Sequence, residues 1–149
     1  MMDQIDKKIL MLLQENDKHS YEQLAKKLEL APSTVHSRVK KLKDSGIIKS
    51  FSAIVDTAKV GYPTISWLGL TVDPLKISEI AKKLSRYPEV QLVASCSGDH
   101  DLVVQLIAKD MKSLWRFINE KIKTIQGVTS KMDVSGFIDV WKSTHKVEL

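Results

Sequence analysis

The chain has 149 residues and a single cysteine, Cys96, so no disulfide can form within it, which is typical of proteins in a reducing compartment. Its formal net charge of +5 is compatible with a polyanionic partner such as nucleic acid. No apolar run approaches the ~18 residues of a membrane span, and the first residues lack the apolar core of a secretion signal. We therefore expect a cytoplasmic protein with no membrane partner.

The first thirty residues predict two helices. Residues 3–13 have an Asp at the start and apolar residues at helical spacing. In residues 20–28, Ser20 and Gln23 have the spacing of a capping box, which marks a helix start. Only three residues, 29–31, separate the second helix from the next apolar pattern. Two helices joined by so short a turn predict a helix-turn-helix unit.

The third helix, predicted for residues 32–45, carries the most informative surface. Pro32 suits a first helical position, and Gly46 suits the residue that ends a helix. Its buried stripe is Val35, Val39 and Leu42. Opposite the stripe, hydroxyl side chains lie toward the start and cations toward the end, as DNA recognition in a major groove requires. Lysines near a helix C-terminus also complement the helix dipole, so the pattern alone does not specify DNA.

Charge distribution strengthens the interpretation, because residues 31–50 contain five cations and one acid, a net charge of 5 − 1 = +4. A dimer would present two such helices to half-sites separated by about one turn of double-stranded DNA or a multiple of it. The predicted DNA contacts are Ser20, Tyr21, Ser33, Thr34, His36, Ser37, Arg38, Lys40, Lys41 and Lys49.

The rest of the chain predicts a second domain. Residues 47–55 read as a strand that completes a winged helix-turn-helix over residues 1–55, and residues 56–63, with Gly and Pro, read as a hinge. Residues 64–149 then give strands at 65–72, 90–97, 102–108 and 128–140, with helices after Asp73 and Asp110. This βαββαβ order predicts a ferredoxin-like domain, and hence an α+β fold overall.

Two of these strands are apolar on both faces, although helices can cover only one face of the sheet. The uncovered face predicts a two-fold dimer in which the same face of a second copy packs on it. The alternative is that the wing segment or the C-terminal tail covers this face within one chain.

These features together resemble the Lrp/AsnC (feast/famine) transcriptional regulators. The resemblance rests on the helix-turn-helix unit, the hinge, the βαββαβ order and three stretches, DQIDKKILMLLQENDKHS, PSTVHSRVKKLKDSGII and SCSGDHDLVVQLIAKD. The last contains the most specific piece, the turn Gly98–Asp101, in which His100 holds the family's variable position. The resemblance implies a homodimer that assembles further to an octamer, and a free amino acid as effector.

The resemblance also places the effector between dimers, against this turn and the last strand. The implied ligand contacts are Gly98, Asp99, His100, Asp101, Val134 and Ser135, with Met132 or Asp133 as alternatives on the strand. A turn rich in backbone N–H groups with a nearby carboxylate suits a zwitterion. A Gly-Asp pair between two strands is also an ordinary hairpin turn.

No catalytic motif is present, and the four histidines follow no zinc spacing, so we expect neither an enzyme nor a metal or other cofactor. The alternative function is a tetrapyrrole-modifying enzyme similar to the sirohaem decarboxylases, which share the two-domain frame. That function would require cations and histidines around a large pocket in the second domain, whereas the cations here gather on the third helix.

Overall fold

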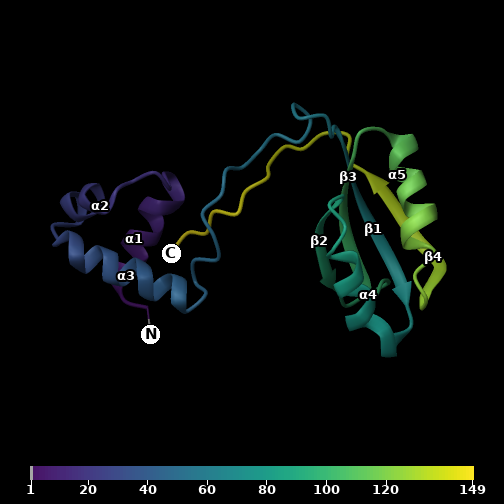
Figure 1. Ribbon diagram of the computed structural model, residues 1–149, viewed down its shortest axis with the longest axis horizontal. Coiled ribbons are helices and arrows are strands. Elements are labelled where there is room, and N and C mark those ends of the chain that lie inside the picture. Colours follow the sequence, from purple (N-terminus) through teal and green to yellow (C-terminus); the bar gives the residue numbers. More distant parts are fainter. Residues whose placement is uncertain (1) are drawn as a thin grey trace. The chain divides into compact units, whose positions relative to one another are not determined.

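The computed structural model describes residues 2–149 and divides the chain into two units, each described here by itself (Figure 1). The first unit comprises residues 2–54 together with Lys142–Leu149, and the second is Val55–Trp141. Within residues 2–149, no helix is both long enough and apolar enough to cross a membrane.

Three helices form the first unit: α1 (Gln4–Glu15), α2 (Tyr21–Leu28) and α3 (Pro32–Asp44). Asp3 and Asp6 form a capping box at the start of α1, and Ser20 and Gln23 form another at the start of α2. Ala31, before α3, makes no side-chain cap. The core contains residues from all three helices: Ile9, Leu10, Leu13, Leu24, Ala25, Val35, Val39 and Leu42. The predicted helix-turn-helix unit is therefore present.

The predicted wing strand is absent from the structure of residues 2–149. The structure has no strand between the end of α3 and Thr64, and residues 47–55 are in extended or irregular backbone. A strand requires hydrogen-bonded partners on a neighbouring strand, and this segment has none within residues 2–149. Ile48 packs partly on the helix core, but Ile47, at 48% exposure, Ile54, at 88%, and Val55, at 56%, are left largely in solvent.

The C-terminal tail belongs to the first unit, which corrects the predicted assignment of residues 142–149 to the second domain. The Gln14 side chain on α1 donates to the Val147 carbonyl oxygen at 3.0 Å, and the Val147 N–H donates to Gln14 Oε1 at 2.7 Å. Lys146 Nζ lies 3.9 Å from Glu15 Oε1. The tail is thus held by the last turn of the first helix.

The second unit is a four-stranded antiparallel sheet in the order β2-β3-β1-β4. Its strands are β1 (Thr64–Val72), β2 (Val90–Ser95), β3 (Leu102–Ala108) and β4 (Val128–Gly136), with β4 ending earlier than predicted. A short 3-10 turn, Pro74–Lys76, leads into α4 (Ile77–Leu84), and α5 (Met111–Phe117) continues into a π-helical turn, Ile118–Ile122. This is the predicted ferredoxin-like order (Figure 1).

The two faces of the sheet differ. On one, residues such as Leu68, Leu70 and Val104 are fully buried beneath α4 and α5. The other, which we call the open face, is covered by no helix of this unit. It carries Ile65, Trp67, Gly69, Leu92, Val103, Gln105 and Ile107. Trp67 is 37% exposed and Leu92 42% exposed, so this face presents apolar surface to solvent.

Candidate nucleic-acid interface and effector site

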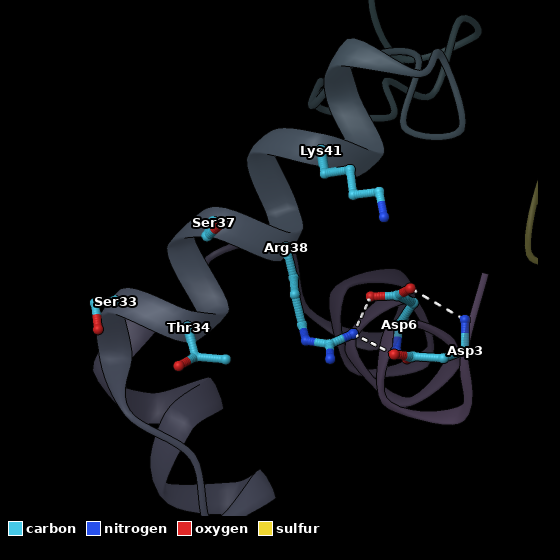
Figure 2. A pocket seen from close by; sticks show the side chains of 7 residues that line it. All are labelled: Asp3, Asp6, Ser33, Thr34, Ser37, Arg38 and Lys41. Carbon is cyan, nitrogen blue, oxygen red and sulfur yellow. Dashed lines mark hydrogen bonds and ion pairs between the residues drawn. The ribbon is translucent and has the colours of Figure 1, made fainter. Parts of the chain in front are cut away.

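The outer side of α3 and the start of α1 enclose a shallow cavity of about 480 Å³. Figure 2 shows the side chains that line it. They are Asp3 and Asp6 from the start of α1, and Ser33, Thr34, Ser37, Arg38 and Lys41 from α3. The structure therefore brings together five of the ten predicted DNA contacts. Two carboxylates, which the α3 pattern could not reveal, lie beside them.

The two carboxylates bind Arg38. Its Nη1 atom lies 2.6 Å from Asp3 Oδ2 and 2.8 Å from Asp6 Oδ1, as the dashed lines in Figure 2 show. A backbone N–H bond from Asp6 and the Arg38 guanidinium together hold the pKa of the Asp3 carboxyl below its usual value. The same ion pairs raise the pKa of Arg38. Arg38 is thus bound to the protein's own acids.

The lysines are placed differently. Lys40 pairs with Asp44 on the same helix at 2.7 Å, and this hydrogen bond raises the pKa of Lys40. Both side chains are more than 60% exposed, so the pair adds little to stability. Lys43 Nζ lies 5.6 Å from the centroid of the Phe51 ring. Within the described residues, Lys41 makes no ion pair and lies exposed beside the hydroxyl side chains.

The remaining predicted DNA contacts lie around α3. Tyr21, the first residue of α2, packs its ring against His36 of α3 with the planes at 83° and the centroids 5.1 Å apart. The Ser20 hydroxyl accepts from the Gln23 N–H at 3.2 Å, so its first role is to cap α2. Lys49 is exposed in the irregular segment after α3.

The predicted effector turn, Gly98–Asp101, joins β2 to β3 and is fixed by Asp101. The Asp101 N–H donates to the Leu70 carbonyl at 2.9 Å, and its carboxylate accepts from the Val72 N–H at 2.8 Å. The Cys96 N–H donates to the Asp101 carbonyl at 3.1 Å. Gly98 has a φ of +129°, a conformation that favours glycine. Asp101 therefore holds the turn against β1, while Asp99 remains exposed.

His100 lies across the middle of β1. A Cβ added to Gly69 would come within 2.4 Å of His100 Cδ2, so the ring occupies the space that the missing side chain leaves. His100 Nε2 lies 3.3 Å from Asp133 Oδ2 on β4. The other ring nitrogen, Nδ1, is buried and has no hydrogen-bond partner within residues 2–149. The turn, β1 and β4 thus meet on the open face.

The strand register decides which residues of β4 reach this place. Asp133 pairs with Gly69 and Ser135 with Trp67, so both lie on the open face. Val134 pairs with Leu68 and packs on the core beneath the helices, as does Met132. We therefore replace Val134 by Asp133 among the candidate effector contacts. Gly69, which sequence reasoning missed, could have been suspected because an interior strand glycine often marks a close approach.

No three His, Cys, Asp or Glu side chains within residues 2–149 are grouped to hold a metal ion. Two family models match the chain. A winged helix-turn-helix DNA-binding model matches residues 2–49, and the Lrp/AsnC ligand binding domain model matches residues 67–135.

Individual proteins agree with these models. An uncharacterized HTH-type transcriptional regulator of Pyrococcus horikoshii is 35% identical over 87% of this chain and 82% of its own length. The HTH-type transcriptional regulator FL11 of the same organism is 39% identical over 85% of this chain and 83% of its own length. Among solved structures, AsnC of E. coli superposes with a TM-score of 0.91 at 23% identity over 100% of this chain and 99% of that one. A Neisseria meningitidis transcriptional regulator in complex with L-Met superposes with a TM-score of 0.89 at 24% identity over 99% and 96%. This chain therefore belongs to the Lrp/AsnC family of DNA-binding, helix-turn-helix transcriptional regulators, as its sequence motifs predicted.

Proposed function

We propose that this regulator binds a free amino acid at the Gly98–Asp101 turn and that the bound effector alters its assembly or its affinity for DNA. The observation that carries the proposal is the placement of His100 over Gly69 and beside Asp133 on the open face. The Neisseria relative was solved with L-Met, which supports an amino acid as the class of effector.

The chemistry of the site suits a zwitterion. Asp133 is 71% exposed and supplies a carboxylate that can accept from an ammonium group. The exposed backbone at Gly98 and Asp99 offers N–H groups for a carboxylate. The Asp101 carboxylate accepts from the Val72 N–H, so its role is to keep the turn in place. His100, at the family's variable position, is the side chain that we expect to distinguish effector side chains.

A thermal-shift panel of the twenty amino acids tests the effector site. We expect at least one amino acid to raise the melting temperature, because a ligand that binds only the folded state stabilises it. Asp133→Asn should abolish that shift, whereas Asp139→Asn, an exposed aspartate beyond the end of β4, should leave it intact. A panel with no shift, or equal loss in both variants, would count against the site.

For assembly, we propose that the open face packs on the open face of a second copy. Trp67 and Leu92 stay partly in solvent in one chain, and an antiparallel sheet with apolar residues on both faces is stabilised when its second face is covered. Light scattering should give the mass of two or, as the family resemblance implies, eight chains. Trp67→Lys should shift that mass toward one chain, and a monomeric wild type would refute the proposal.

On the DNA side, we propose that Ser33, Thr34, Ser37 and His36 contact bases and that Lys41 contacts phosphate. All five are exposed on α3, and Lys41 makes no ion pair within the described residues. Fragments selected from a random DNA pool should share two related half-sites. Lys41→Ala should weaken binding to every sequence and make its salt dependence shallower, whereas Ser37→Ala should change the selected sequence. Unchanged binding in both variants would show that α3 does not contact DNA.

A further inference from the structure

Arg38 differs from the other cations of α3 in where its partners lie. The partner of Lys40 is on the same helix, but the partners of Arg38, Asp3 and Asp6, are at the start of α1. Its side chain is only 27% exposed and that of Asp6 only 8%. Arg38 therefore joins two helices within the first unit, in the wall of the cavity that Figure 2 shows.

All four carboxylate oxygens of this cluster have a defined partner. Asp3 Oδ1 accepts from the Asp6 N–H at 2.8 Å, and Asp6 Oδ2 accepts from the Asp3 N–H at 3.1 Å. The remaining oxygens, Asp3 Oδ2 and Asp6 Oδ1, both accept from Arg38 Nη1. The capping box thus fixes the carboxylates before they meet the guanidinium, and a rigid acceptor pair constrains the Arg38 side chain more than two free carboxylates would.

We infer that Arg38 is a positioning residue that sets the orientation of α3 for reading DNA and that it does not itself bind phosphate. The trio of Arg38, Asp3 and Asp6 has a formal charge of +1 − 2 = −1, so the charge of Arg38 is already neutralised by the protein's own carboxylates and attracts a phosphate only weakly. The buried residues Val35, Val39 and Leu42 hold α3 on the core, but apolar contacts are non-directional. The Arg38 cluster lies to one side of that stripe and restricts rotation of α3 about its own axis.

This role predicts a loss of sequence discrimination. Ser33, Ser37 and His36 can reach base edges only if the outer side of α3 faces the groove at the correct angle, because hydrogen bonds weaken steeply with misalignment. Phosphate contacts through flexible lysines tolerate such a rotation. Disruption of the cluster should therefore weaken specific binding and leave non-specific binding almost unchanged.

The test compares Arg38→Met, which keeps an unbranched, flexible side chain but removes the guanidinium, with Lys41→Ala as the matched control. Two DNA probes are used: a duplex selected from a random pool by the wild-type protein, and a scrambled duplex of the same length. Each variant is titrated with both at several salt concentrations. Circular dichroism first shows that the variant is folded under these conditions. For Arg38→Met we expect the ratio of the two affinities to fall about tenfold, as when one base is no longer read by a well-aligned side chain, while the salt slope is unchanged. For Lys41→Ala we expect weaker binding to both duplexes and a slope shallower by about 0.9 for each phosphate that the protein no longer neutralises.

Variants of the two carboxylates distinguish the two possible roles of Arg38, because each role predicts a different change in DNA binding. If Arg38 binds phosphate, removing a competing carboxylate should strengthen DNA binding. If Arg38 is a positioning residue, the same change should lower the affinity ratio. Asp6→Asn is the direct test, since Asn retains an oxygen for the capping box. Asp3→Asn, at a side chain 51% exposed, serves as the second variant in case Asp6→Asn does not fold. Arg38→Lys, which can still reach one carboxylate, should restore part of the ratio.

Three outcomes overturn the inference: a shallower salt slope in Arg38→Met, tighter binding in either carboxylate variant, or a folded Arg38→Met with an unchanged affinity ratio. The last would mean that Arg38 contributes to stability alone. The inference rests on α3 being the DNA-reading helix of the proposed function, and Lys41→Ala separates the two. If neither Lys41→Ala nor Ser37→Ala affects binding, α3 is not that helix. If Lys41→Ala weakens binding but Arg38→Met does not change the affinity ratio and the salt slope as expected, only the role assigned to Arg38 is wrong.

Discussion

Gly69 permits the sharpest test of the effector site, because its missing side chain makes room for His100. In Gly69→Ala the new methyl carbon would lie 2.4 Å from His100 Cδ2, 2.5 Å from Nε2 and 2.7 Å from Cγ. Favourable carbon–carbon contacts are about 3.5–4 Å. The ring must therefore leave its place, expose surface that is now covered, and separate from Asp133.

The cost follows from what has to move. Overfilling a packed site costs roughly 1–3 kcal/mol of the free energy of unfolding. Since the ring belongs to a side chain that can rotate away, we expect the lower part of that range, about 1–2 kcal/mol. In a His100→Ala background the obstacle is absent, and Gly→Ala within a strand should then stabilise by about 0.5–1 kcal/mol. The effect of one methyl group should thus change sign between the two backgrounds.

Urea unfolding followed by tryptophan fluorescence measures both effects. All three tryptophans, Trp67, Trp115 and Trp141, lie in the second unit, so their emission reports the unit that contains Gly69. A double-mutant cycle on Gly69 and His100 should give a coupling of about 1.5–3 kcal/mol. If Gly69→Ala costs the same free energy in both backgrounds, the ring does not lie over Gly69 and the proposed site loses its support.

Three further predictions concern the first unit. Ser20→Ala should lower its free energy of unfolding by about 1 kcal/mol, measured by circular dichroism, because Ser20 caps α2. The pKa of Asp3 is lowered in the folded state, so its contribution to stability is complete above the unfolded pKa and is lost as pH falls through the folded value. Asp3→Asn should therefore flatten the decline in stability measured at several pH values below about 5. Gln14→Ala should release the tail around Val147 and increase its cleavage in limited proteolysis, whereas equal cleavage would mean that Gln14 does not hold it.

Local signals predicted most of the fold. The Asp at the start of α1 and the Ser20–Gln23 capping box are patterns that act within one turn of a helix, so they identified both helix starts. The apolar periods likewise identified β1, β3, α4 and α5, because each pattern includes a face that the structure buries. The absence of a cap at Ala31 was also visible in the sequence.

The errors came from partners far away in the chain. The β-branched residues at 47–55 suit a strand, but a strand also needs a neighbour, which sequence propensity does not reveal. The Gln14 contact with Val147 joins residues 133 positions apart. Val134 and Asp133 are neighbours on β4, and neighbouring side chains in a strand point to opposite faces, so only the register shows that Asp133 lies on the open face and Val134 on the core.

The register of β4 also bears on how an effector could act at a distance. It places Asp133 and Ser135 on the open face together with Trp67, and this is the face that we propose for self-association. A ligand that contacts His100 and Asp133 therefore changes the surface that a second copy meets. Linkage makes this effect reciprocal. If the ligand strengthens association between copies, association must strengthen ligand binding by the same factor, and if the ligand weakens association, association must weaken ligand binding equally. If dissociating the assembly with Trp67→Lys leaves the effector affinity unchanged, the site and the interface are independent, and the effector must reach DNA binding by another route.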